Sequence, residues 1–275
     1  MRKPKVLFVS QEIFPFLPSN QISDISRKLP QKTQESGKEI RVFMPKFGCI
    51  NERRHQLHEV IRLSGMNLIV DDNDHPLIIK VASIPAGRMQ VYFIDNEEYF
   101  QRKAVHGSKE EAFFSDNDER AMFFCKGVLE TVKKLGWTPD IIHCHGWMAS
   151  FMPLYLKKVY HNDPHFSESK VVFSAFGEQL EEKLDAKLTD KLAFDGIETK
   201  AINDLEEPNI EKLYQLGMEY SDAVVLGDDK ANDTFASFCE KNEKQIITPS
   251  LEEHFDSCNS LYDTILEENS VLVEE

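Results

Sequence analysis

Short apolar runs alternate along the chain with longer segments in which apolar residues recur every three or four positions. The runs at 6–9, 170–174 and 223–226 are rich in Val, Leu, Phe and Ala. Runs of this kind are typical of strands that are buried on both faces of a parallel sheet. The longer segments between them have the spacing of amphipathic helices. The alternation predicts an α/β fold in which helices cover a mostly parallel sheet.

The first 45 residues contain a complete strand–helix–strand unit. Apolar residues at helical spacing predict a helix over 21–36, which Gly37 ends. Pro30 lies inside this segment and should kink or split the helix. A strand at 40–44 follows, so the unit is expected to be a right-handed crossover. In α/β proteins, ligands usually bind in the loop after such a first strand.

The rest of the chain extends this plan. Short strands between 66 and 94, separated by turn residues, predict a β-hairpin insertion. Further elements are expected in alternation, with helices at 118–135, 147–160, 210–220, 230–241 and 259–267 and a strand at 140–144. We therefore expect a single Rossmann-like domain over 1–250, with a mostly parallel sheet, and an acidic C-terminal helix and tail over 251–275.

Negative charge is concentrated in the last third of the chain. The formal net charge is -15, and residues 1–185 contain 25 Lys and Arg against 25 Asp and Glu. Residues 186–275 contain 7 Lys against 22 Asp and Glu, and no Arg follows Arg120. Such a surface repels nucleic acid and anionic membranes, so neither partner is expected. It also lacks the guanidinium groups that usually clamp a diphosphate, although it could simply serve solubility.

Other sequence features limit the location and the chemistry. The five cysteines are scattered without C-x-x-C spacing, and no apolar run approaches the ~18 residues of a membrane span. The apolar run near the N-terminus is short for a signal peptide, so a cytoplasmic protein is expected. The chain contains no G-x-G-x-x-G, Walker or G-x-S-x-G motif. We therefore expect no cofactor and assign no catalytic residue.

Two isolated features have competing interpretations. His143 and His145 follow each other along a strand end and could form half of a metal site. Packing and capping are the preferred interpretation, and without neighbouring carboxylates in the sequence we assign no metal. Glu12, just after the first strand, could contact a ligand or serve as a structural turn partner.

Several segments resemble bacterial glycogen synthases and plant starch synthases. The resemblance begins with KVLFVSQEIFPF at 5–16 and IRVFMPKF at 40–47. It continues in the same order with VYFIDNEEYFQR at 91–102, DNDER at 116–120, GWTPDIIHCHGWMASFMPLYLK at 136–157 and YSDAVVL at 220–226. It implies the GT-B architecture, in which two Rossmann-like domains face each other across a cleft. This chain would be equivalent to the N-terminal half of such a glycosyltransferase.

The chain departs from this family where the family carries its chemistry. The family's K-T-G-G-L loop aligns with P-S-N-Q-I at 18–22, although the following Asp is kept as Asp24. Proline supplies neither charge nor N–H, and Asn and Gln carry Cβ atoms where glycine lets the backbone approach phosphate. The family's H-D-W and H-N motifs become H-G-W at 145–147 and F-G at 176–177. From this resemblance we expect that the family's C-terminal domain, which holds an Arg/Lys pair and a catalytic Glu, is missing.

The ligand-binding candidates are polar and aromatic residues near the strand ends: Glu12, Ser19, Asn20, Asp24, Tyr99, Asn117, His145 and Trp147. The aromatic residues Tyr99, Phe100, Phe113, Phe114 and Trp147 could form a stacking platform for a neutral glucan, or they could belong to the core. The expected partners are an α-glucan or nucleotide sugar at a remnant site, or another protein.

Three functions remain open at this point. The first is a degenerate synthase-like domain that acts by binding a glucan or a protein. The second is a glucosyltransferase that extends an α-1,4-glucan from ADP-glucose or UDP-glucose, with its second domain supplied by another chain. The third is an unrelated small-molecule enzyme on the same fold.

Overall fold

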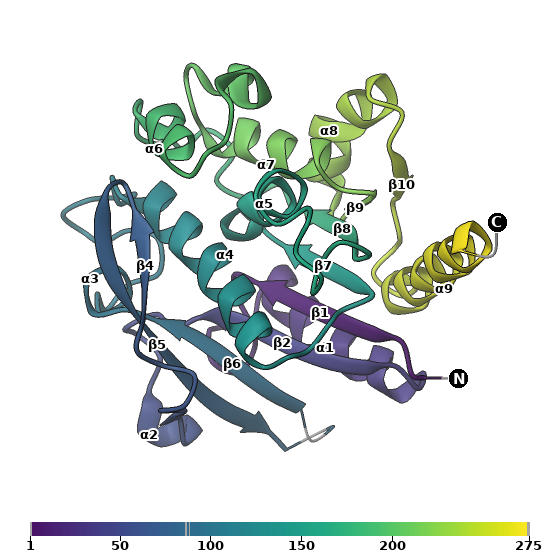
Figure 1. Cartoon of the computed structure of the whole chain (residues 1–275), viewed down its shortest axis with the longest axis horizontal. Coiled ribbons are helices and arrows are strands. Elements are labelled where there is room, and N and C mark those ends of the chain that lie inside the picture. Colours follow the sequence, from purple (N-terminus) through teal and green to yellow (C-terminus); the bar gives the residue numbers. More distant parts are fainter. Residues whose placement is uncertain (1, 86, 88, 274–275) are drawn as a thin grey trace.

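The computed structural model describes residues 2–85, 87 and 89–273. Its centre is a sheet with the strand order β10-β9-β8-β7-β1-β2-β6-β5-β3, and β4 pairs with β5 off this path (Figure 1). The strands are β1 (Lys5–Ser10), β2 (Glu39–Pro45), β3 (His58–Glu59), β4 (Met66–Val70), β5 (Asn73–Ile84), β6 (Met89–Asp95), β7 (Ile141–His145), β8 (Lys170–Ala175), β9 (Ala223–Leu226) and β10 (Gln245–Ile247).

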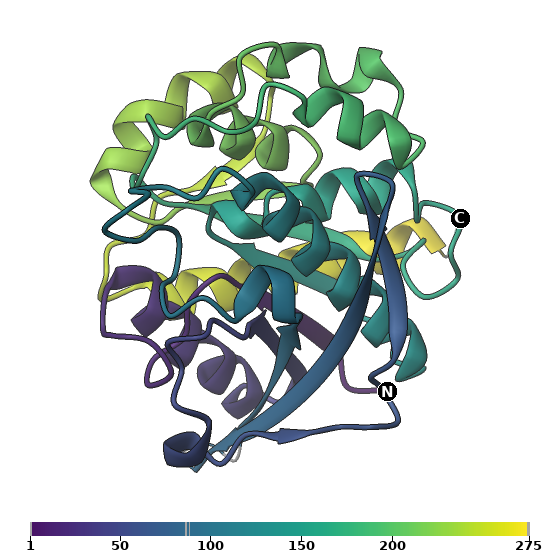
Figure 2. The ribbon, with the colours of Figure 1, turned by 90° about the vertical axis from the view of Figure 1, so that its left-hand side faces the viewer.

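The sheet combines a parallel body with an antiparallel insertion. The neighbouring strands from β10 through β1 to β6 pair in parallel, whereas β5 pairs antiparallel with β6, β3 and β4. Figure 2 shows the long β5 crossing the molecule with β4 beside it. The predicted α/β fold, with its mostly parallel sheet and hairpin insertion, is therefore confirmed.

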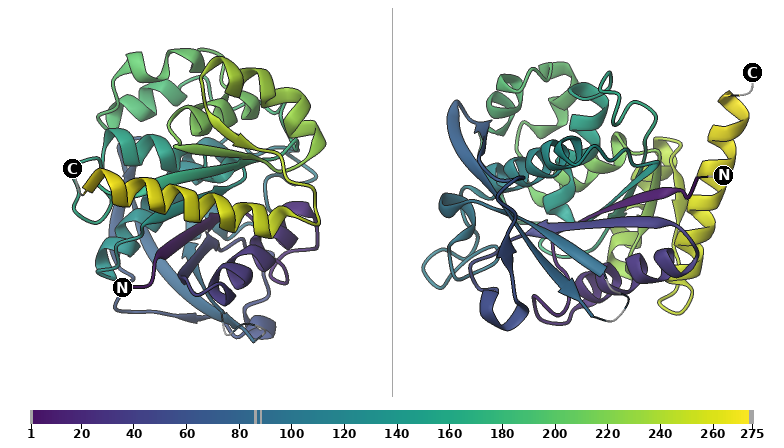
Figure 3. Two further views of the ribbon diagram at one scale, coloured as in Figure 1. Left: turned by 90° about the vertical axis from the view of Figure 1, so that its right-hand side faces the viewer. Right: turned by 60° about the horizontal axis from the view of Figure 1, so that its bottom comes forward.

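Helices cover both faces of the parallel body. Figure 3 shows α1 and α9 on one face, whereas α4, α5 and α7 lie on the other. The helices are α1 (Gln21–Glu35), α2 (Glu52–His55), α3 (Glu97–Phe100), α4 (Asn117–Lys134), α5 (Phe151–Lys158), α6 (Leu188–Phe194), α7 (Ile210–Glu219), α8 (Asp229–Lys241) and α9 (His254–Val273), with 3-10 turns η1 (Trp147–Ala149) and η2 (Thr199–Leu205). Because both faces are covered, residues 6–9 of the central β1 are completely buried. Among the described helices, none combines the length and the apolar character needed to cross a membrane.

Three local expectations differ from the structure. The helix α1 is not split at Pro30, whose ring is buried with the apolar face of the helix. Packing of that face outweighs the hydrogen bond that proline cannot make. The segment predicted as one helix over 147–160 is a 3-10 turn followed by the shorter α5. The last helix begins at His254 rather than near 259, because its first turn also packs on the sheet.

Candidate functional site

The candidate site lies at the edge where the parallel strands β1, β7, β8 and β9 end. Main-chain hydrogen bonds join the first residues beyond these strands: Gln11 N donates to His145 O (3.2 Å), Gly146 N to Ser174 O (3.2 Å) and Gly227 N to Ala175 O (2.8 Å). The loops that follow therefore leave from one edge of the sheet. This is the edge at which ligands bind in open α/β sheets.

The loop from β1 to α1 is closed by its own polar side chains. Asn20 caps α1: its Oδ1 accepts from Ser23 N (2.8 Å), and its N–H donates to Ser23 Oγ (2.9 Å). The amide Nδ2 of Asn20 also donates to Glu12 Oε2 (2.6 Å). Ser19 Oγ donates to Asp24 Oδ2 (2.8 Å). The four candidates from this loop thus lie together, but their polar groups bind one another.

The electrostatics of this loop disfavour an anion. Glu12 is 8% exposed, and burial raises the pKa of its carboxyl despite the hydrogen bonds that it accepts. The pKa of Glu178 is also raised, first by burial and then by the charges of Glu12 and Asp228. Lys230 is a cation close to Glu178. A phosphate beside Glu178 would meet more carboxylates than cations, so its binding there would be opposed by repulsion.

Gln11 accounts for the glycine in the H-G-W segment. Gly146 has φ +83°, and a Cβ at this position would overlap with Oε1 of Gln11. The Gln11 side chain is completely buried, so it has no solvent to move into. The aspartate that the resemblance places here would fit neither the backbone angle nor the space.

The two candidates on either side of Gly146 are both buried. The Nδ1 of His145 lies 3.2 Å from Ser10 Oγ and 3.2 Å from Ser26 Oγ. Burial lowers the pKa of His145 to about 3, so its imidazole is neutral. Trp147 is 0% exposed, and its Nε1 donates to Gln179 Oε1 (3.0 Å). Both side chains therefore lie inside the protein and not at its surface.

Tyr99 and Asn117 belong to a cluster around the buried Arg120. Arg120 Nε donates to the carbonyl of Tyr99 (2.9 Å), and its Nη1 donates to Asn117 Oδ1 (2.5 Å). The hydroxyl of Tyr99 donates to Glu119 Oε2 (3.0 Å) and lies 2.9 Å from His75 Nε2. These contacts join α3 to α4, and they give both candidates a structural role.

The aromatic residues lie in the core, which is the second of the two interpretations left open by the sequence. Tyr99, Phe100, Phe114 and Trp147 are at most 5% exposed. Phe113 is half-buried and packs against Trp147, with 5.7 Å between ring centroids. A sugar would need an open ring face, and these four buried rings do not offer one.

The possible cation sites are occupied by the protein's own groups. Both ring nitrogens of His143 contact hydroxyls, those of Tyr262 and of Ser174 (2.7 Å). In the described residues, one group of carboxylates is close enough to share a cation, namely Asp118, Glu119 and Asp185. The ammonium of Lys191 lies 2.8, 2.7 and 2.8 Å from these three carboxylates and takes the place of a cation.

Three residues that shape this region were not among the candidates: Gln11, Gln21 and Lys191. The side chain of Gln21 donates from Nε2 to Gly227 O (2.6 Å), and so connects the start of α1 to the end of β9. One sign of this contact was available in the sequence, because the resemblance places a glycine at the position of Gln21. Its partner lies 206 positions away, so the sequence could not identify it.

Comparisons with known proteins agree with this arrangement. The family model of the starch synthase catalytic domain matches residues 5–232. A glycogen synthase of Chlorobium limicola is 38% identical over 227 residues, which are 81% of this chain and 45% of that protein. A glycogen synthase of Chlorobium chlorochromatii is 40% identical over 182 residues, covering 63% of this chain and 36% of that protein.

A solved structure supports the fold independently. The catalytic domain of starch synthase IV from Arabidopsis thaliana, bound to ADP and acarbose, superposes with a TM-score of 0.68 at 17% identity. The match covers 90% of this chain and 51% of that one. The chain thus spans about half of the length of such relatives, 45% for the first Chlorobium enzyme. Sequence and fold together show that this chain belongs to the starch synthase catalytic domain family, in which it matches the N-terminal half of the glycogen synthases.

Proposed function

We propose that this chain is a starch-synthase-like domain that does not transfer glucose by itself and acts by binding an α-glucan. The observation that carries the proposal is the closed loop between β1 and α1. There the amide of Asn20 is bonded to Glu12, and the side chain of Gln21 is bonded to Gly227. The polar side chains of this loop are thus already bonded within the protein, and their Cβ atoms stand where glycines would let the backbone approach a phosphate.

Charge supports the same proposal. Transfer from a nucleotide sugar builds negative charge on the departing diphosphate, which needs cations or oriented donors nearby. At this edge, the charges near Glu178 are the carboxylates of Glu12 and Asp228 and the ammonium of Lys230. A neutral saccharide does not experience this repulsion, and its hydroxyls can donate to carboxylates. The Arabidopsis structure holds both ADP and acarbose, and the saccharide is the ligand that suits the charges here.

Glucose transfer provides the test. The purified chain is incubated with glycogen and either ADP-glucose or UDP-glucose, alongside the Chlorobium limicola enzyme as a positive control. We expect no incorporation above the level without protein. Incorporation by the purified chain would contradict the proposal. Incorporation that requires added cell lysate would instead favour a transferase whose second domain is supplied by another chain.

Binding is tested separately by electrophoresis in native gels with and without glycogen. We expect the glycogen to retard the chain. Unchanged migration would favour a protein partner as the ligand of this domain, and a small molecule that copurifies with the chain would favour an unrelated enzyme.

A further inference from the structure

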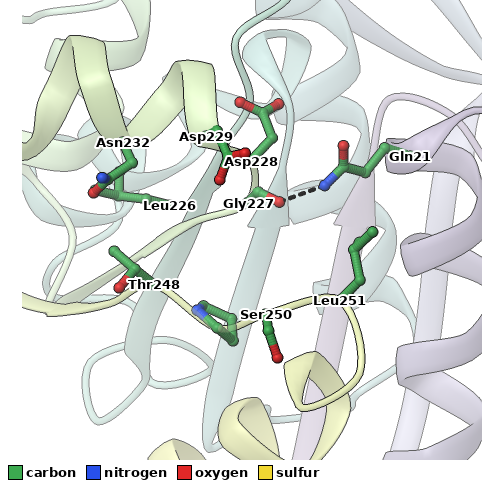
Figure 4. A pocket seen from close by; sticks show the side chains of 10 residues that line it. Gln21, Leu226, Gly227, Asp228, Asp229, Asn232, Thr248, Ser250 and Leu251 are labelled. Carbon is green, nitrogen blue, oxygen red and sulfur yellow. Dashed lines mark hydrogen bonds between the residues drawn. The ribbon is translucent and has the colours of Figure 1, made fainter.

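A cavity of about 310 Å³ lies beside the loop from β1 to α1, at the ends of β9 and β10 (Figure 4). Three segments form its walls. They are the start of α1 at Gln21, residues 226–229 with Asn232 of α8, and residues 248–251 between β10 and α9. Its volume is at the lower end of the range found for small-molecule pockets.

The first wall depends on Gln21. Its Nε2 donates to Gly227 O (2.6 Å), the contact drawn as a dashed line in Figure 4. The side chain thereby spans the gap between α1 and the end of β9. A glycine, which the family resemblance places here, would leave this side open. Gln21 thus replaces a glycine of the family's phosphate-binding loop, and its side chain forms a wall of the cavity.

The third wall lies outside the family match. Residues 248–251 line the cavity, whereas the starch synthase model matches residues 5–232. Two of the three walls thus come from residues that depart from the family pattern or lie beyond it. The shape of the cavity therefore depends partly on residues that the family pattern does not supply.

Several polar side chains of the cavity are free to meet a ligand. The carboxylate of Asp228 is already engaged, because it accepts from the main-chain N–H groups of Gly177 (2.9 Å) and Ala231 (2.7 Å). The neighbouring Asp229 is exposed, and its carboxylate has no hydrogen-bond partner among the described residues. Asp229 therefore offers the cavity an open, charged acceptor.

The other lining residues define the ligand chemistry. The side chains of Asn232 and Thr248 make no hydrogen bond within the part of the chain that the structure describes, and both can donate and accept. The lining contains no Lys or Arg, whereas Leu226, Pro249 and Leu251 add apolar surface. This combination repels phosphate and suits a molecule with hydroxyls around an apolar face. An unphosphorylated sugar has this chemistry.

We propose that this cavity binds the end of an α-glucan, one or two uncharged sugar residues deep. The inference deepens the proposed function and rests on it, since it gives the glucan-binding domain a site. Asp229, Asn232 and Thr248 bind the sugar hydroxyls, and Leu251 at the lip contacts the ring. The residues 248–251 determine which saccharide fits.

The test uses the full chain labelled with ¹⁵N and titrated with maltotriose in an NMR experiment. We expect the amide signals of Gly227, Thr248 and Leu251 to shift together and to saturate. The variant Asp229→Ala should bind maltotriose about tenfold more weakly, because it loses a hydrogen bond to a charged group. The matched control is Asp233→Ala, which removes an exposed Asp one turn further along α8 and should leave the affinity unchanged.

The outcomes separate this inference from the proposed function. If glycogen retards the chain but maltotriose shifts only signals from another part of it, the cavity is not the binding site, although the domain still binds a glucan. Glucose transfer by the purified chain would contradict the proposed function, whichever amide signals maltotriose shifts. Equal weakening by Asp229→Ala and Asp233→Ala, or tighter binding of 1,4-diaminobutane than of maltotriose, would also overturn the assignment.

Discussion

At the scale of single residues, Gly146 is constrained both by its backbone angle and by the buried side chain of Gln11. We predict that Gly146→Ala lowers the free energy of unfolding by about 2–5 kcal/mol, since a positive φ costs ~1–2 kcal/mol and overpacking ~1–3 kcal/mol. Urea denaturation followed by circular dichroism measures this loss. Gly65→Ala is the matched control, because Gly65 has φ +84° and nothing lies within 4 Å of its added Cβ. Equal losses in the two variants would show that Gln11 yields to the new methyl group.

Lys191 provides a second prediction at this scale. Its side chain is 2% exposed and bridges three carboxylates, including Asp118 at 0% exposure. Lys191→Met should lower the free energy of unfolding at pH 7 by about 3–5 kcal/mol, because it leaves buried negative charge without a cation. Lys187→Met, at an exposed lysine of the same segment, should cost less than about 0.5 kcal/mol.

The loss caused by Lys191→Met should shrink in acid. Burial raises the pKa of Asp118 to about 6 even with Lys191 present, and without the lysine this pKa rises further. The folded variant then binds more protons than its unfolded chain, so lowering the pH from 7 to 5 stabilises it relative to the wild type. Urea denaturation at both pH values measures the difference. A loss that is equal at both would show that the carboxylates do not depend on Lys191.

At the scale of elements, α9 packs on the sheet through a group of buried imidazoles and hydroxyls. His254 is 1% exposed, and the hydroxyl of Tyr262 contacts His143. Burial lowers the pKa of His254 to about 4 and that of His145 to about 3, and it lowers the pKa of His143 as well. Cys258 and Tyr262 complete the buried side of α9 and are themselves uncharged at neutral pH. The helix therefore covers a set of neutral histidines.

These pKa values predict that acid weakens the packing of α9. An imidazole in the unfolded chain has a pKa of about 6.5, so the unfolded chain binds protons first as the pH falls from 6.5 to 4.5. In this pH range the free energy of unfolding should therefore fall as the pH falls. The variant His254→Leu should make this fall smaller by up to about 1.4 kcal/mol per pH unit. The exposed His161→Leu is the control. Because the raised pKa values of Glu12 and Asp118 act in the opposite sense, the comparison between variants, and not the net pH profile, decides the prediction.

The elements also show how far sequence reasoning reaches. The β1–α1–β2 unit could be predicted, because a continuous apolar run and an amphipathic helix follow from local patterns. The short β10 could not be predicted, because three residues show no periodicity. The contact of α9 with the sheet could not be predicted either, because its packing partners lie on strands far away in the sequence. The candidates Glu12, Ser19, Asn20 and Asp24 lie together because they share one loop. That their polar groups bind one another is a matter of side-chain geometry, which spacing does not encode.

At the scale of the whole molecule, the distribution of charge opposes the binding of anions. The net charge of -15 arises from residues 186–275, and these residues form part of the edge where the parallel strands end. Long-range repulsion therefore adds to the local repulsion by Glu12 and Glu178. A single restored cation should therefore recover anion binding in part, and mostly at low salt, where exposed charges are not screened.

The triple variant Pro18→Lys/Asn20→Gly/Gln21→Gly tests this balance, because it restores the lysine and the two glycines of the family's loop. We expect ADP to bind about tenfold more tightly at low salt than to the matched variant Pro18→Gln/Asn20→Gly/Gln21→Gly, since the two differ by one charge near the phosphates. The gain should disappear at about 0.5 M salt, where exposed charges are screened. Calorimetric titration measures both effects, and a gain that persists in salt would contradict an electrostatic cause. Both variants also lose the Gln21 wall of the cavity, so maltotriose should bind each of them more weakly than the wild type while ADP distinguishes them.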